Sequence, residues 1–115
     1  MTIENFYALT GGDYADTKLR FLTDDRILRF VGKFPSDESF SLLKSSLAEN
    51  NAETAFRAAH TLKGVASNLG FTSLFKVSSE ITEVLRGGNT VAEEQFAELE
   101  KIYDLIIEHI KDLQA

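Results

Sequence analysis

The residues best suited to chemistry lie together in one run, NAETAFRAAHTLKGVASNLG, which spans residues 51–70. The run contains His60, one of only two histidines in the chain, followed by Lys63 and Gly64. An imidazole is a nucleophile in its neutral form, which predominates at neutral pH. If the run is helical, Lys63 lies one turn from His60 and can place its ammonium beside an anion on the ring. This combination suits the holding of a phosphoryl group.

Gly64 needs an explanation, because glycine inside a helix costs about 1 kcal/mol relative to alanine. Helical side chains lean toward the N-terminus, so a larger residue at position 64 would cover the surface around His60. Glycine leaves that surface open and lets another molecule approach the ring. The competing interpretation is that Gly64 marks a close contact between helices.

Two further residues share the predicted face of His60. Arg57 precedes the histidine by three positions and Ser67 follows it by seven, so both are candidates for touching an anion or a partner. The expected core stripe runs beside this row, which leaves His60 partly exposed. That stripe consists of Phe56, Ala59, Leu62, Ala66 and Leu69.

The elements that position these residues all have a helical pattern, and no segment shows the alternation typical of strands. We expect a short helix over residues 13–22, and then longer helices over 23–34, from Ser36 to Asn50, over 51–69, from Thr72 to Arg86, and from Thr90 to Leu113. On one face of the 23–34 helix the pattern places Ile27, Phe30, Val31 and Phe34. The predicted caps are Thr23, Ser36, Asn51, Gly70 and the capping box Thr90–Glu93.

Short connections between long helices require antiparallel neighbours. The predicted fold class is therefore all-α: an antiparallel up-down four-helix bundle with one or two short N-terminal helices. We expect residues 1–115 to form a single domain. Met1 and a full set of bundle helices favour a free-standing protein.

Composition excludes several classes of function. The chain has no cysteine, which excludes disulfides and thiolate sites, and its net charge of −6 with scattered basic residues argues against nucleic acid. No apolar run approaches the ~20 residues of a membrane helix, and no secretory signal is visible, so we expect no membrane association and a cytoplasmic location. The phosphate-binding and dinucleotide glycine motifs are also missing.

The run from Ala59 to Gly70, A-H-T-L-K-G-x-x-x-x-L-G, resembles the signature of histidine-containing phosphotransfer (HPt) domains. These phosphorelay modules of two-component signal transduction shuttle a phosphoryl group between aspartates of response-regulator receiver domains. Upstream, GGDYADTKLRFLTDDRILRFVGKFPSD resembles the N-terminal pattern of the family, so the resemblance covers about residues 9–86.

The resemblance implies that His60 is the phosphoacceptor, that Lys63 stabilises the phosphoryl group and that Gly64 gives access. It implies a phosphoprotein that carries phosphohistidine, acts as a monomer and has no ATP-dependent kinase activity, so it is not an enzyme in the usual sense. The expected partners are response-regulator receiver domains, a hybrid histidine kinase, or both. The resemblance places the acidic cluster and Mg²⁺ on the receiver, and we expect neither a cofactor nor a metal on this chain.

Other interpretations of the same residues must be weighed. A di-iron bundle needs Glu-x-x-His pairs, but Arg57 and Ile106 stand three positions before His60 and His109. No third group marks a Ser–His–Asp hydrolase, and His109 has no lysine–glycine companion. The alternative that stays open is a non-phosphorylated helical adaptor that binds a receiver or kinase domain and inhibits transfer.

Overall fold

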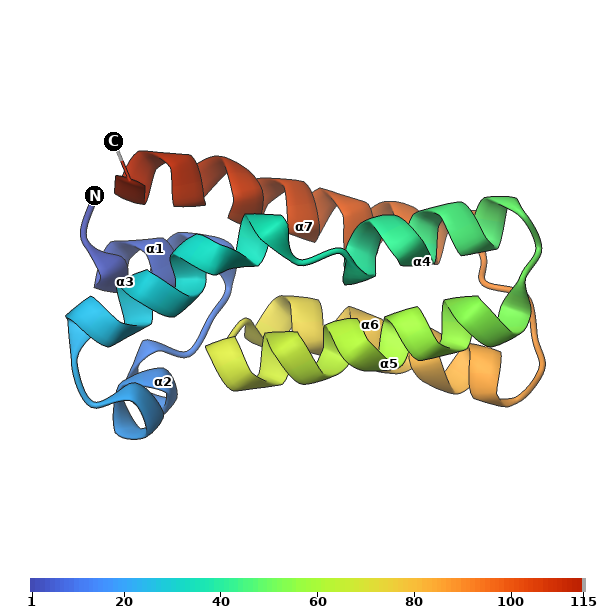
Figure 1. The fold of residues 1–115 in the computed structure, drawn as a ribbon, viewed down its shortest axis with the longest axis horizontal. Helices are drawn as coiled ribbons and strands as arrows, with labels where there is room; N and C mark the ends of the chain where they lie inside the picture. The colour runs from blue at the N-terminus through green and yellow to red at the C-terminus, as the bar shows by residue number, and fades with distance from the viewer. Residues whose placement is uncertain (115) are drawn as a thin grey trace.

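The computed structural model describes residues 1–114. Within these residues the chain forms seven α-helices and one short 3-10 helix, and no strand (Figure 1). The predicted all-helical class is therefore confirmed. Four helices, α4 to α7, run alternately up and down, and each is antiparallel to the one before it.

The bundle is built from α4 (Ser39–Ala48), α5 (Ala52–Leu69), α6 (Thr72–Arg86) and α7 (Glu93–Gln114). Short connections and glycines with positive φ separate α5 from α6 and α6 from α7, at Gly70 and Gly88. The apolar stripes of the bundle helices meet in one core that includes Leu43, Leu62, Leu74, Ile81, Leu99 and Ile106, all fully buried.

Three more helices precede the bundle: α1 (Ile3–Thr10), α2 (Tyr14–Phe21) and α3 (Asp24–Lys33). Threonine or aspartate side chains cap all three at their N-termini, at Thr2, Asp13 and Thr23. The 3-10 helix η1 (Phe34–Ser36) contains Pro35 and connects α3 to α4, so that the two helices follow each other along the bundle (Figure 1). The helices predicted over residues 13–22 and 23–34 correspond to α2 and α3, whereas no helix is predicted from the sequence where α1 lies.

Two of the predicted caps are wrong. Ser36 lies inside η1, and the start of α4 is instead held by the Asp37 side chain, which accepts from the Ser39 backbone N–H at 2.9 Å. Glu93 is the first residue of α7 rather than its third, so Thr90 is too far from the helix to form a capping box with it. In both cases the helix begins two or three residues later than the sequence pattern indicates.

Two phenylalanines predicted for the core are also displaced. Phe30 is 40% exposed, because the buried face of α3 is centred on Ile27 and Val31. Phe56 is only half-buried, because α5 turns Ala55 and Ala59 into the core on either side of it. One position along a helix is a rotation of about 100°, which is enough to move a ring from the core to its edge.

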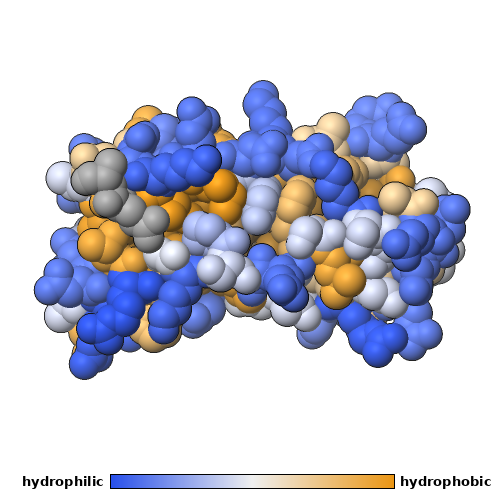
Figure 2. All heavy atoms as spheres, turned by 45° about the horizontal axis from the view of Figure 1, so that its top comes forward, coloured by the Kyte–Doolittle hydropathy of each residue, from blue (hydrophilic) through white to orange (hydrophobic). Residues whose placement is uncertain are grey.

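One face of the molecule is mostly polar. With the upper side of Figure 1 turned forward, Figure 2 shows hydrophilic side chains over most of that face, with separate apolar areas between them. Among residues 1–114, no helix has the length and apolar character needed to cross a membrane.

Candidate functional site

The candidate site lies in the middle of α5, and the local sequence fixes both ends of this helix. The Asn51 side chain accepts from the Thr54 backbone N–H at 3.2 Å. At the other end Gly70 adopts φ 72°, and its N–H donates to the Ser67 carbonyl at 3.2 Å. His60 is therefore carried by the interior of a capped helix.

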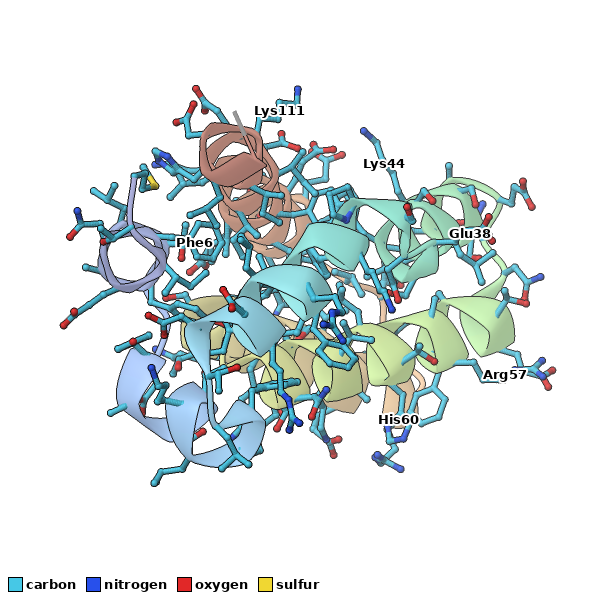
Figure 3. All side chains as sticks on the ribbon, turned by 60° about the vertical axis from the view of Figure 1, so that its left-hand side comes forward. Phe6, Glu38, Lys44, Arg57, His60 and Lys111 are labelled. Atoms are coloured by element: carbon cyan, nitrogen blue, oxygen red, sulfur yellow. The ribbon has the colours of Figure 1, made fainter. Side chains whose placement is uncertain are left out.

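The predicted row of residues lies on the outer face of α5. His60, Gly64, Ser67 and Arg57 are all exposed, and Lys63 is half-buried. Figure 3 shows His60 and Arg57 projecting from α5 on the side away from α7. The imidazole can thus be reached by a molecule outside the bundle.

Gly64 is the most open position of this face. A Cβ built on Gly64 would meet no heavy atom within 4 Å beyond its own helix neighbours. Gly64 is therefore not a point where two helices pack closely, and the packing interpretation is excluded. Any side chain here would project into the space beside His60, and only glycine leaves that space empty.

The imidazole stacks on the Phe56 ring, which in turn lies against the Arg86 guanidinium. The Phe56 ring lies one turn before His60, nearly parallel to it, with ring centroids 6.2 Å apart and an angle of 15° between the planes. The Arg86 guanidinium, from the last turn of α6, lies 5.0 Å from the Phe56 ring centroid and also pairs with Glu83 at 3.1 Å. The stack holds the Phe56 ring in place on one face of the site. It also places the Arg86 cation, which comes from α6, near that face.

The remaining two candidates have other partners. Arg57 forms an ion pair with Glu53 at 3.0 Å and lines a groove with Asp37, Glu38 and Leu42, one turn away from His60. Ser67 is exposed, and its carbonyl accepts a hydrogen bond from Arg20 at 3.1 Å. Both residues share the face of His60, and within the described residues neither forms a hydrogen bond or ion pair with the imidazole.

The family model described as the Hpt domain matches residues 36–114, which is more than half of the chain and includes all of α5. The chain belongs to the Hpt domain family. Hpt domains are phosphotransfer modules of phosphorelays, are not kinases themselves, and interact with receiver domains and kinases. Neither the curated proteins nor the solved structures gave a match.

The Hpt match begins at η1 and extends through α7, so it includes the final helix, which the sequence signature does not reach. Helices α1, α2 and α3 lie outside the matched residues. They nevertheless contact the site helix of the Hpt domain.

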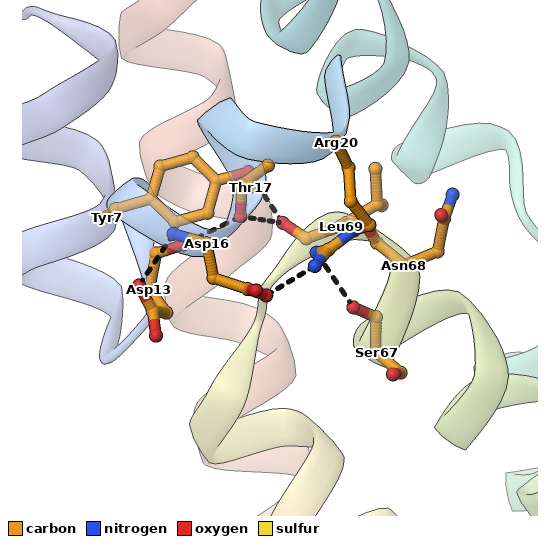
Figure 4. Close-up of polar contacts among 8 residues, drawn as sticks. All are labelled: Tyr7, Asp13, Asp16, Thr17, Arg20, Ser67, Asn68 and Leu69. Carbon is orange, nitrogen blue, oxygen red and sulfur yellow. Dashed lines mark hydrogen bonds and ion pairs between the residues drawn. The ribbon is translucent and has the colours of Figure 1, made fainter. Parts of the chain in front are cut away.

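The polar contacts from α1 and α2 are made by three side chains, here called the α5 bracket: Tyr7, Thr17 and Arg20 (Figure 4). The Leu69 carbonyl accepts from the Tyr7 hydroxyl at 2.6 Å and from Thr17 at 3.4 Å, and Arg20 donates to the Asn68 carbonyl at 2.9 Å. The last carbonyls of a helix lack partners within it, so the bracket supplies them. Burial raises the pKa of Tyr7 to about 12, which keeps its hydroxyl protonated as a donor.

The second histidine lies elsewhere in the Hpt domain. His109 is on α7, and its Nδ1 is 3.5 Å from an oxygen of Asp112. It is largely buried, with a side chain 21% exposed. The two histidines therefore differ in access: His60 is exposed, whereas His109 is largely buried.

Sequence reasoning missed Arg86 and the α5 bracket. Phe56 could have been assigned to the site, because it stands four positions before His60 and thus on the same face. Arg86 and Arg20 come from other helices, and nothing local in the sequence connects either of them to position 60.

Proposed function

We propose that this Hpt domain accepts a phosphoryl group on His60 and returns it, in exchange with the aspartate of a response-regulator receiver domain. The observation that carries the proposal is the exposed imidazole beside an empty position at Gly64, in a chain of this family. The proposal includes action as a monomer in the cytoplasm, with receiver domains, a hybrid histidine kinase or both as partners.

The step would be a direct transfer between two side chains. A ring nitrogen of His60 attacks the phosphorus of the aspartyl phosphate, a P–N bond forms and the P–O bond to the aspartate breaks. The carboxylate leaves with the electron pair of that bond, and no water takes part. The reverse reaction passes the group to an aspartate in the same way.

Lys63 would stabilise the charge of the phosphoryl group, since an ammonium one turn along the helix can reach toward an anion on the imidazole. The Phe56–Arg86 stack supplies a second cation near the same face. Residues 1–114 contain no cluster of three or more histidine, cysteine or acidic side chains placed to hold a metal ion. We propose that the Mg²⁺ of the reaction belongs to the receiver domain.

The test is to mix the purified protein with receiver domains phosphorylated on aspartate, in the presence of Mg²⁺. We expect mass spectrometry to find one added phosphoryl group on His60, labile in acid and stable in alkali. The control variants are His60→Gln, which should abolish the adduct at unchanged helix content, and His109→Gln, which should retain it.

Two results would overturn the proposal. Phosphorylation that survives His60→Gln would place the acceptor elsewhere. Binding of receivers without any phosphoryl transfer would instead support the adaptor that inhibits transfer.

A further inference from the structure

The four-helix bundle has a cavity at one end. The α4–α5 turn and the α6–α7 connection both lie at this end, on the right of Figure 1. The cavity has a volume of about 560 Å³ and is lined by residues of all four bundle helices and of both connections. Sites that bind small molecules have volumes of roughly 300–1,000 Å³. We call this space the end cavity.

The end cavity is separate from the phosphoryl-transfer site. Neither His60 nor Lys63 nor Gly64 lines it. The residue of α5 that lines it is Ala52, which precedes His60 by eight positions, or about 12 Å along the helix axis. The two sites can therefore be tested independently.

Small side chains explain why this end of the bundle is not filled. Helix α7 begins only at Glu93, so the α6–α7 connection is extended and does not cover the end with a helical turn. Several small residues stand where larger ones would close the space: Ser46, Ala48, Ala52, Gly88 and Ala97.

The apolar part of the lining comes from four side chains that the protein only partly covers. Leu85 is 8% exposed, and Leu47, Val91 and Phe96 are half-buried. A molecule with an apolar body would bury these side chains further, which is favourable in water. The end cavity thus resembles the mostly apolar pockets that hold small ligands.

One buried polar group in the lining has no partner. Ser46 is 3% exposed, and its hydroxyl forms no hydrogen bond within the described residues. The buried hydroxyls of Ser39 and Ser78 do have partners, the Asp37 carboxylate and the Leu74 carbonyl. Buried hydroxyls are normally hydrogen-bonded. The Ser46 hydroxyl is therefore available to a molecule inside the end cavity.

Charge determines which kind of molecule suits the end cavity. Its lining contains one basic and two acidic residues, Lys44, Glu93 and Glu100, a net charge of −1. Lys44 is paired with Glu100 at 2.6 Å, whereas Glu93 forms no ion pair within the described residues. Phe96 shares the lining face of α7 with both glutamates, and an aromatic ring also attracts cations. A cation is thus favoured over an anion.

We infer that the end cavity binds a small molecule with an apolar body and one primary ammonium group. The apolar body covers Leu47, Leu85 and Phe96. The ammonium donates to the Ser46 hydroxyl, and the unpaired charge of Glu93 stabilises it. This site goes beyond the proposed function, because phosphoryl transfer at His60 does not require it.

The test is a titration of the isotope-labelled protein with phenylbutylamine, followed by two-dimensional NMR of the backbone amides. Phenylbutanol and phenylbutyrate have the same apolar body with a neutral or an anionic head group, and they serve as matched probes. We expect saturable shifts at the α4–α5 turn, the end of α6 and the start of α7, with a Kd of about 1 mM. The amine should bind about tenfold more tightly than the butyrate.

Two variants test the polar contacts. Ser46→Ala should weaken binding of the amine by about threefold to tenfold at unchanged helix content. Glu93→Gln should weaken the amine by about threefold to fivefold and leave phenylbutanol unchanged. The matched control is Glu94→Gln, because Glu94 is an exposed neighbour that does not line the end cavity. His60→Gln should bind the amine with wild-type affinity.

Three results would contradict the inference. Shifts that do not saturate, or that are centred on His60, would show that the end cavity does not hold the probe. Equal affinities for the amine and the butyrate would overturn the preference for an ammonium group. The same loss in Glu93→Gln and Glu94→Gln would show that general surface charge, and not the lining of the end cavity, attracts the cation.

Discussion

Replacing Gly64 tests access to the His60 imidazole separately from the stability of the fold. The position is helical, exposed and free of any heavy atom within 4 Å of an added Cβ. An added side chain should therefore meet no steric resistance, and the helix should gain from the loss of glycine. Gly64→Ala should stabilise the fold by about 1 kcal/mol, and Gly64→Gln by about half of that.

These energies translate into a measurable shift. At about 2.1 cal/mol/K per residue, the unfolding entropy of 115 residues is about 240 cal/mol/K. A gain of 1 kcal/mol then raises Tm by about 4 °C. Thermal unfolding followed by circular dichroism resolves such a difference for Gly64→Ala, and the shift for Gly64→Gln should be about 2 °C.

Transfer should change in the opposite direction. The glutamine at position 64 fills the space beside His60 that an incoming phosphoryl donor must enter, and a misplacement of about 1 Å can cost about 100-fold in rate. We expect transfer from a receiver to fall by about that factor in Gly64→Gln, and to a smaller extent in Gly64→Ala. Ala97→Gln, on an exposed position of α7, introduces the same side chain away from the site and should leave transfer unchanged.

One combination of results would refute the role of Gly64 in access to His60. If Gly64→Gln lowers Tm, and transfer per folded molecule stays normal, then glycine serves the fold and not access to the imidazole.

Three further changes test other parts of the site and its support. Lys63→Ala should slow transfer or shorten the lifetime of the phosphohistidine by about fivefold to tenfold, because an ammonium near the phosphoryl group is lost. The decay of the adduct measures this lifetime. Lys63→Arg should restore most of the wild-type rate and lifetime. Arg86→Ala should shorten the same lifetime by about twofold to fivefold, whereas a purely structural Arg86 would change the urea midpoint and leave the lifetime alone. Tyr7→Phe should cost about 1–2 kcal/mol of stability near neutral pH through the lost bond to Leu69. Since the pKa of Tyr7 is raised to about 12 in the fold, wild-type stability should fall as the pH rises from 10 through 12; urea unfolding at pH 8 and pH 11 should show a smaller loss in Tyr7→Phe.

The parts of the fold that could be predicted are those set by neighbours in sequence. Asn51 and Gly70 bound α5 as expected, because a side-chain cap and a left-handed glycine act within a few residues. The same local reasoning placed His60, Gly64 and Ser67 on one exposed face.

The sequence predictions are wrong where a small difference in angle around a helix decides whether a side chain is buried. Phe30 and Phe56 stand beside the true centre of their buried faces, and periodicity alone does not distinguish adjacent positions on a helix wheel. The contacts of Arg86 with Phe56, and of Arg20 with the end of α5, join helices distant in sequence. No local pattern specifies which of several exposed arginines such a contact uses.

The α5 bracket also has a consequence for the order in which the domain folds. Its hydrogen bonds join residues about 50 to 60 positions apart, between Tyr7 and Leu69 or Arg20 and Asn68, whereas α5 and α6 form a hairpin of neighbouring segments. Contacts close in sequence form with less loss of chain entropy, so α1 and α2 should join the bundle late and detach from it first. Backbone amides of α1 and α2 would then exchange with solvent faster than those of α5 and α6. In such a partly opened molecule α5 still carries His60, but α1 and α2 no longer contact the end of that helix.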